Sequence, residues 1–194
     1  MIRRHRQTCG AAESLHAARA TLIDRRRFLL QLAGGSIAAL FGLPPAARAS
    51  TFDPWPTLDA VLQHLLPTEP DTPGASEIHA RQYFEVVVTD NRIEQQERTF
   101  ITQGCVWLDQ LSRQEQGKPF TRLNEHQREQ LLRQTARSEA GENWLSTLIT
   151  YLLESLLTAP AYGGNPNGIG WHWLTYVPGF PLPQPGNRFM ELPL

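Results

Sequence analysis

One leucine-rich segment constrains the fold of this chain more than any other feature of its sequence. Between residues 144 and 157, apolar side chains recur three and four residues apart and form a stripe two residues wide at every turn. This spacing predicts an α-helix, because a repeat of 3.6 residues brings such positions onto one face. The wide stripe predicts that this helix is the most buried of the chain. The stripe consists of Trp144, Leu145, Leu148, Ile149, Leu152, Leu153, Leu156 and Leu157.

Two further helices are predicted near the start of the globular part. Residues 57–66 carry leucine and valine side chains at helical spacing, and a loop rich in proline follows. Residues 76–90 form the second helix, although the triplet Val86–Val88 would also suit a strand because its side chains are β-branched.

Capping patterns mark the remaining helices. Asn91 followed by Glu94 has the pattern of a capping box and predicts the start of a third helix, which ends at Gly117. Asn124 followed by Gln127 predicts the start of a fourth. Together with residues 144–157, these segments predict an all-α fold, a small bundle of about five helices over residues 50–159.

The first 49 residues have the three parts of an export signal. They hold eight Arg and only two acidic residues, a net charge of +6, and an apolar run over residues 28–43 follows the basic part. Small residues then stand at the spacing that a signal peptidase reads, which predicts cleavage after Ala49. The cleavage site is formed by Ala47, Ala49 and Ser50.

The signal also contains a twin-arginine motif, which predicts export to the periplasm in a folded state. An arginine pair is followed by one position that any residue can occupy and then by Phe-Leu. The motif residues are Arg25, Arg26, Phe28 and Leu29. The alternative is an uncleaved single-pass anchor. The run is short for a membrane span and is interrupted by Gly34 and Gly35, so we favour the cleaved signal.

Removing the signal changes the charge and the cysteine content of the chain. The whole sequence has 18 Lys and Arg against 19 Asp and Glu, whereas residues 50–194 have 10 against 17, a net charge of −7. This balance gives no reason to expect binding to nucleic acid. Cys105 is then the only cysteine, on the apolar stripe of the third helix. A buried thiol that acts as a small hydrophobic group is favoured, and an intermolecular disulfide to a partner is the alternative.

The composition changes at Pro160. The 35 residues from there to Leu194 include six Gly and seven Pro, which exclude a sixth regular helix. Disordered tails are poor in aromatic residues, but this segment is rich in them. We therefore expect residues 160–194 to be an irregular arm that lies on another surface. Its aromatic residues are Tyr162, Trp171, Trp173, Tyr176, Phe180 and Phe189.

Within this arm, residues 162–171 read Y-G-G-N-x-x-G-x-G-W. Glycines allow close approach of the backbone to another surface, and Trp171 would be the anchor. In an extended stretch, Trp171 and Trp173 would project to the same side. The predicted partner-docking residues are Tyr162, Gly163, Gly164, Asn165, Gly168, Gly170, Trp171 and Trp173.

Motifs for catalysis or cofactor binding were not found. The sequence has no dinucleotide-binding or phosphate-binding glycine motif, no Cys-x-x-Cys pair and no nucleophile elbow. Its histidines after the signal are too far apart in sequence to place two ligands on one helix face. They are His64, His79, His126 and His172. We expect no catalytic, cofactor-binding or metal-binding residue in this chain.

The glycine-aromatic string follows a leucine-rich helix that ends at Ala159-Pro160, and the chain begins with a twin-arginine signal. This combination resembles the gluconate 2-dehydrogenase subunit 3 family, most specifically over residues 162–171. The resemblance implies an accessory subunit that accompanies a large FAD-dependent dehydrogenase of the glucose-methanol-choline type, often with a multihaem cytochrome c. The flavin and the catalytic histidine would belong to the large subunit, and contact with the membrane would be only through the complex.

A twin-arginine signal directs the export of folded proteins, yet this chain has no cofactor motif of its own. This suggests that the folded protein exported by means of the signal is a partner. The resulting hypothesis is that this chain exports a leaderless, flavin-loaded dehydrogenase and remains bound to it. Two alternatives stay open: a small periplasmic enzyme that acts alone, and a free helical binding module or chaperone.

Overall fold

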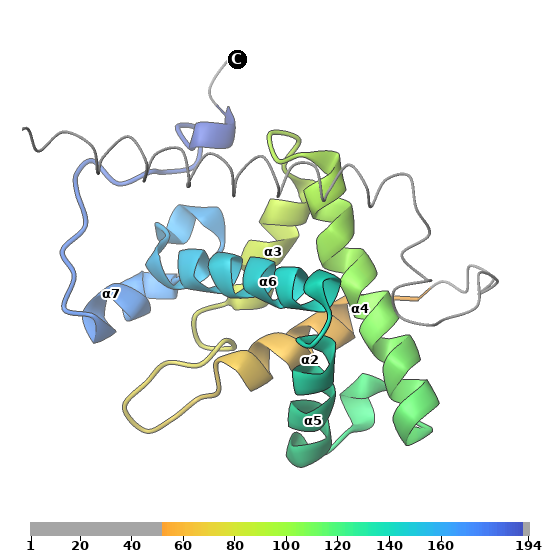
Figure 1. The fold of residues 1–194 in the computed structure, drawn as a ribbon. Coiled ribbons are helices and arrows are strands. Elements are labelled where there is room, and N and C mark those ends of the chain that lie inside the picture. Colours follow the sequence, from red (N-terminus) through yellow and green to blue (C-terminus); the bar gives the residue numbers. More distant parts are fainter. Residues whose placement is uncertain (1–51, 192–194) are drawn as a thin grey trace, which may run out of the picture. The chain divides into compact units, whose positions relative to one another are not determined.

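The computed structural model describes residues 52–191. The twin-arginine motif and the cleavage site, from Arg25 to Ser50, lie outside the described residues. Six α-helices are present in the described part (Figure 1), and the predicted all-α class is confirmed. The helices are α2 (Trp55–Leu65), α3 (Ala80–Thr89), α4 (Gln95–Gln116), α5 (Glu125–Thr135), α6 (Glu139–Leu157) and α7 (Ile169–Trp173).

Four of these helices, α2, α3, α4 and α6, pack against one another and enclose the core. Trp144 of α6 is buried at its centre, and its indole Nε1 donates to the carbonyl oxygen of Ile101 in α4, 3.1 Å away. Gly104 makes this approach possible, since a Cβ there would stand 2.1 Å from the same indole nitrogen. The rings of Tyr151 in α6 and Phe84 in α3 pack edge to face, with 5.9 Å between ring centres.

The helix boundaries follow local capping, and two predicted starts were wrong. The capping box of Asn124 and Gln127 is present at the start of α5, as predicted. The segment around Asn91 is a turn instead, because Asp90 accepts from the backbone N–H of Arg92, and α4 starts only at Gln95. The helix α6 starts at Glu139, earlier than predicted, because the Ser138 hydroxyl accepts from the N–H of Gly141 and caps it.

The triplet Val86–Val88 is helical and belongs to α3, so the alternative of a strand is excluded. The arm also differs from expectation. It contains one helical turn, α7, which lies beside the C-terminal end of α6 (Figure 1), together with single 3₁₀ turns. These are η3 (Pro160–Tyr162), η4 (Pro166–Gly168) and η5 (Phe189–Glu191). Within residues 52–191, no helix combines the length and apolar character needed to cross a bilayer.

Candidate functional site

Asn165 lies at the centre of the glycine-aromatic string and is completely buried. Its side-chain amide donates to the carbonyl oxygen of Thr158 at 2.9 Å, and its Oδ1 accepts from the N–H of Gly170 at 2.7 Å. Its backbone N–H donates to the carbonyl oxygen of Ile78, 2.8 Å away. One asparagine thus joins the end of α6, the start of α7 and the segment before α3.

The glycines of the string allow the arm to lie directly on α6. A Cβ at Gly170 would stand 2.1 Å from the carbonyl oxygen of Leu156, and one at Gly164 would stand 2.7 Å from that of Ser155. Gly163, with φ +93°, and Gly168, with φ +70°, have backbone conformations that side chains rarely allow. The close approach predicted from these glycines is therefore present, but the surface approached belongs to the same chain.

Trp171 is also part of the fold. Its ring is 8% exposed, and its Nε1 donates to the carbonyl oxygen of Leu157 at 2.7 Å. This corrects the prediction that Trp171 anchors a partner, because its ring and its polar atom are already occupied by α6. Gly164, Asn165 and Gly170 are also occupied by contacts with the end of α6 or within the arm. Trp173 is the exposed apolar member of the predicted docking set.

Beyond Trp171, apolar side chains are uncovered. Trp173 is 42% exposed, and since α7 is helical the two tryptophans do not share one side as expected for an extended stretch. We call the exposed part the aromatic arm surface. It consists of Trp173, Leu174, Tyr176, Val177 and Phe180.

The chain then returns to the bundle. Arg188 donates to the carbonyl oxygen of Ala161, and the N–H of Phe189 donates to the hydroxyl of Tyr162 at 3.0 Å. The guanidinium of Arg92 lies over the ring of Phe189, 5.1 Å from its centre. The carboxylate of Glu191 accepts hydrogen bonds from the side chain and the backbone N–H of Arg188, which lower its pKa to about 2. The aromatic arm surface is thus held at both ends.

A second uncovered surface lies on α6. The wide apolar stripe is only half buried: Ile149, Leu153 and Leu157 are 43%, 53% and 48% exposed. The sequence predicted the most buried helix of the chain, and the structure adds that α3 and α4 cover one side of α6 and leave these three side chains of its stripe open. Thr150 and Glu154, polar residues between these positions, were a signal of the exposed side.

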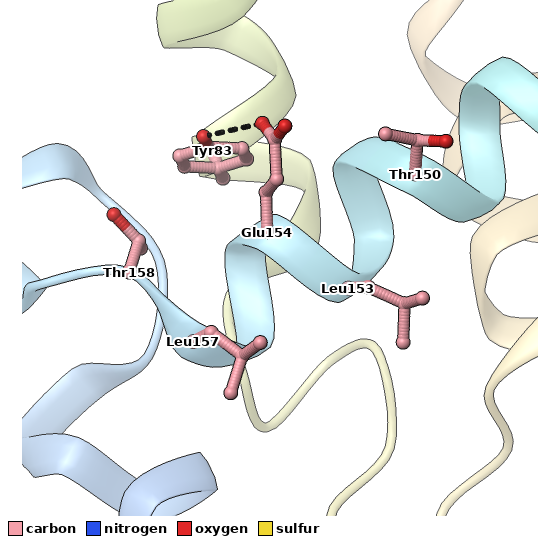
Figure 2. Close-up of a pocket in the computed structure, with 6 residues that line it drawn as sticks. All are labelled: Tyr83, Thr150, Leu153, Glu154, Leu157 and Thr158. Atoms are coloured by element: carbon pink, nitrogen blue, oxygen red, sulfur yellow. Dashed lines mark hydrogen bonds between the residues drawn. The ribbon is translucent and has the colours of Figure 1, made fainter. Parts of the chain in front are cut away.

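Figure 2 shows the hollow here, which we call the α6 groove. Its volume is about 480 Å³, and it is lined by Tyr83, Thr150, Leu153, Glu154, Leu157 and Thr158.

The polar side of the α6 groove is formed by Tyr83 of α3 and Glu154 of α6. The Tyr83 hydroxyl donates to the Glu154 carboxylate, 3.0 Å away (Figure 2). Burial and this carboxylate raise the pKa of Tyr83 above its usual range. Next to it, the hydroxyl of Tyr151 donates to Glu97 at 3.0 Å, and burial and the Glu97 charge raise the pKa of Tyr151 in the same direction. Both phenols therefore remain neutral donors to carboxylates.

Cys105 is completely buried in α4, and its Sγ lies 3.5 Å from the carbonyl oxygen of Ile101. Burial raises the pKa of this thiol, so the reactive thiolate is suppressed. An intermolecular disulfide would require the sulfur to leave the core. The geometry therefore favours the other alternative, a thiol that acts as a small hydrophobic group.

Among the described residues, the histidines and carboxylates do not gather into a metal site, and one histidine pairs with a carboxylate across two helices. No three His, Cys, Asp or Glu side chains between residues 52 and 191 converge to hold a metal ion. The Nε2 of His64 in α2 lies 2.7 Å from the Glu129 carboxylate in α5, and this contact lowers the pKa of Glu129. The pair joins two helices and lies apart from both uncovered apolar surfaces.

Comparison with known proteins gives one match. The family model described as gluconate 2-dehydrogenase subunit 3 matches residues 53–179. The matched range includes the helices from α2 to α7, the glycine-aromatic string and four of the five residues of the aromatic arm surface, and it ends just before Phe180. No curated protein and no solved structure matches the chain.

Proposed function

The chain belongs to the gluconate 2-dehydrogenase subunit 3 family, and from this we propose that it is the non-catalytic small subunit of a periplasmic dehydrogenase complex. Its partner is a large FAD-dependent dehydrogenase of the glucose-methanol-choline type that oxidises a sugar, a sugar acid or an alcohol. The observation that carries this proposal is the aromatic arm surface. Val177 and Phe180 are each 81% exposed in a segment held firmly at both ends.

Energetics support the use of this surface in binding. Exposed aromatic and aliphatic side chains gain about 25 cal/mol for each Å² of apolar area that a partner covers. Because Trp171, Asn165 and Arg188 already hold the arm, less conformational entropy is lost on binding than with a free tail. A surface with these properties is suited to a lasting contact between subunits.

In this complex the large subunit carries out the redox chemistry. FAD and the groups that act on the substrate are in the large subunit, and a multihaem cytochrome c subunit that accepts its electrons is part of the same proposal. The small subunit stabilises the flavoprotein. It also supplies the twin-arginine signal, including Arg25 and Arg26, by which the folded, flavin-loaded partner crosses the membrane.

Co-purification tests the binding function. The full chain with a C-terminal tag is expressed in its native host, recovered from the periplasm, and examined for protein composition and flavin absorbance. We expect a large chain in about equimolar amount, with bound flavin. A colourless tagged protein without a partner would contradict the proposal, and a flavin bound to the small chain itself would indicate an enzyme that acts alone.

Export is tested with a conservative change in the signal. When Arg25 and Arg26 are both changed to Lys, we expect the flavoprotein to remain in the cytoplasm. Changing Arg27, the neighbouring arginine outside the pair, to Lys is the matched control and leaves export intact. Unchanged periplasmic flavoprotein with the double variant would refute the escort role.

A further inference from the structure

The α6 groove has an apolar side that is separate from the aromatic arm surface. Leu153 and Leu157 are one helical turn apart, and Ile149 extends the strip by another turn. Each is about half exposed, at 43% to 53%. Aliphatic side chains at positions i, i+4 and i+8 form the ridge by which one helix packs into the groove of another. The strip therefore has the form of a helix-packing surface without a neighbour.

The other side of the groove carries a carboxylate that pairs with no cation in the described part of the chain. Glu154 accepts one hydrogen bond, from the neutral Tyr83 hydroxyl, and forms no ion pair with any Lys, Arg or His among residues 52–191. Glu97, whose carboxylate accepts from Tyr151 on the adjacent turn of α6, is likewise in no ion pair in that range. Residues 50–194 have a net charge of −7, so this part of the chain has no excess of positive charge to offset these carboxylates.

Leu153, Leu157 and Glu154 all line the α6 groove, so a segment that fills the groove would also remove water from Glu154. A carboxylate that loses its water needs a cation beside it, since an unpaired buried charge costs far more than the contact gains. We propose that the α6 groove binds a segment of the large flavoprotein subunit that places aliphatic side chains on Leu153 and Leu157 and a Lys or Arg beside Glu154. This inference rests on the proposed function and adds to it a second, charge-selective contact.

Two other occupants fit the groove less well. In a two-fold dimer of this chain the same surface would face itself, which would bring Glu154 near its own copy without a cation. An anionic lipid surface would be repelled by Glu154 and by the net charge of −7 on residues 50–194. A basic, apolar segment of a protein partner satisfies both sides of the groove.

Charge reversal tests the proposal in the complex. The flavoprotein that co-purifies with the unaltered chain is identified by mass spectrometry and co-expressed with variants, and the affinity of the two chains is measured at low and high salt. We expect Glu154→Lys to weaken binding at least tenfold and Glu154→Gln to weaken it less. Glu115→Lys, the same charge change at an exposed residue near the end of α4, is the control and leaves binding unchanged.

Crosslinking identifies the occupant directly. A photoreactive benzoylphenylalanine replaces Leu153 in one variant and exposed Gln63 of α2 in another. We expect position 153, and not position 63, to crosslink to a flavoprotein peptide that contains Lys or Arg. Changing this Lys or Arg of the flavoprotein to Glu should then restore the binding that Glu154→Lys weakens. Equal affinity of Glu154→Lys and Glu115→Lys, or a crosslink from position 153 to a second copy, would overturn the inference while leaving the proposed function intact. Failure of the unaltered chain to bind any flavoprotein would overturn the proposed function itself, and this inference with it.

Discussion

The side-chain amide of Asn165 donates to the carbonyl oxygen of Thr158, 2.9 Å away, and so closes the C-terminal end of α6 from outside the helix. The last carbonyls of a helix have no partner within it and must be satisfied by other groups. Here Trp171 satisfies the neighbouring carbonyl of Leu157. The start of the arm is therefore a capping structure for α6, and these two hydrogen bonds fix the point at which the arm leaves the helix.

Replacing Asn165 by Ala should lower the free energy of unfolding by about 3–7 kcal/mol. The change leaves the Thr158 carbonyl and the Gly170 N–H without partners, at about 1–3 kcal/mol for each buried group, and it places Ala in a left-handed conformation with φ +50°. Urea unfolding measures the effect. Asn167→Ala is the matched control, since this exposed residue has φ +55° and should show only the backbone cost of about 1 kcal/mol. Equal losses in the two variants would exclude a special role for the Asn165 side chain.

Gly170→Ala should destabilise the protein by more than about 2 kcal/mol, or release the arm from α6. Its new Cβ would stand 2.1 Å from the carbonyl oxygen of Leu156, and the backbone has to move to relieve that contact. Gly179→Ala is the control, because nothing lies within 4 Å of a Cβ there. Thermal unfolding compares stability, and the rate of proteolytic cleavage after Arg188 reports release of the arm. A Gly170→Ala protein as stable and as resistant as the control would contradict the observed packing.

The hydrophobic pattern predicted the helices well because each has a buried face of its own. It could not show how much of the α6 stripe is covered, since coverage depends on where α3 and α4 lie. Leu153 follows the same period as Leu152, yet one is exposed and the other is buried. The pattern describes a face of the helix, whereas burial depends on the neighbours.

The arm was predicted less well for a related reason. Its glycines indicated a close approach, but a sequence does not show whether the surface approached belongs to the same chain or to a partner. The one-turn helix α7 has no period long enough to detect, and it is fixed by contacts of Asn165 and Trp171 with α6. The start of α4 was misplaced because Asp90, next to the predicted cap Asn91, forms a turn of its own with Arg92.

Cys105 should react slowly with a thiol reagent in the folded protein and quickly in urea. It is completely buried, and burial raises its pKa, so little thiolate is available. The measurement uses Ellman's reagent on the chain with Cys9 changed to Ser, so that one thiol remains. Non-reducing electrophoresis of the complex should show no mixed disulfide. Rapid modification in the native state, or a disulfide-linked partner, would show that the sulfur is accessible.

The closing contact of the arm should depend on pH through Glu191. Its pKa is about 2 in the fold against an ordinary 4.5, so the folded state favours the charged carboxylate. The stabilisation is therefore fully present above about pH 4.5 and is lost as the pH falls towards 2. An NMR titration of the Glu191 side-chain carbon measures this midpoint. Arg188→Ala should raise it, although the backbone N–H of Gly186 still donates to the carboxylate. A midpoint near 4.5 in the unaltered chain would mean that the contact does not form in solution.

The two tryptophans of α7 should separate stability from binding. Trp171→Ala removes a buried ring and its hydrogen bond to Leu157, and should lower the free energy of unfolding by about 3–5 kcal/mol. Trp173→Ala alters a ring that is 42% exposed, so stability should change by less than about 1 kcal/mol. Binding to the flavoprotein should respond to Trp173, because exposed aromatic side chains are common anchors of interfaces. Urea unfolding and the affinity of the co-purified complex are measured for both variants. Normal affinity of a folded Trp173→Ala protein would remove this residue from the docking surface, and unchanged stability of Trp171→Ala would contradict its place in the fold.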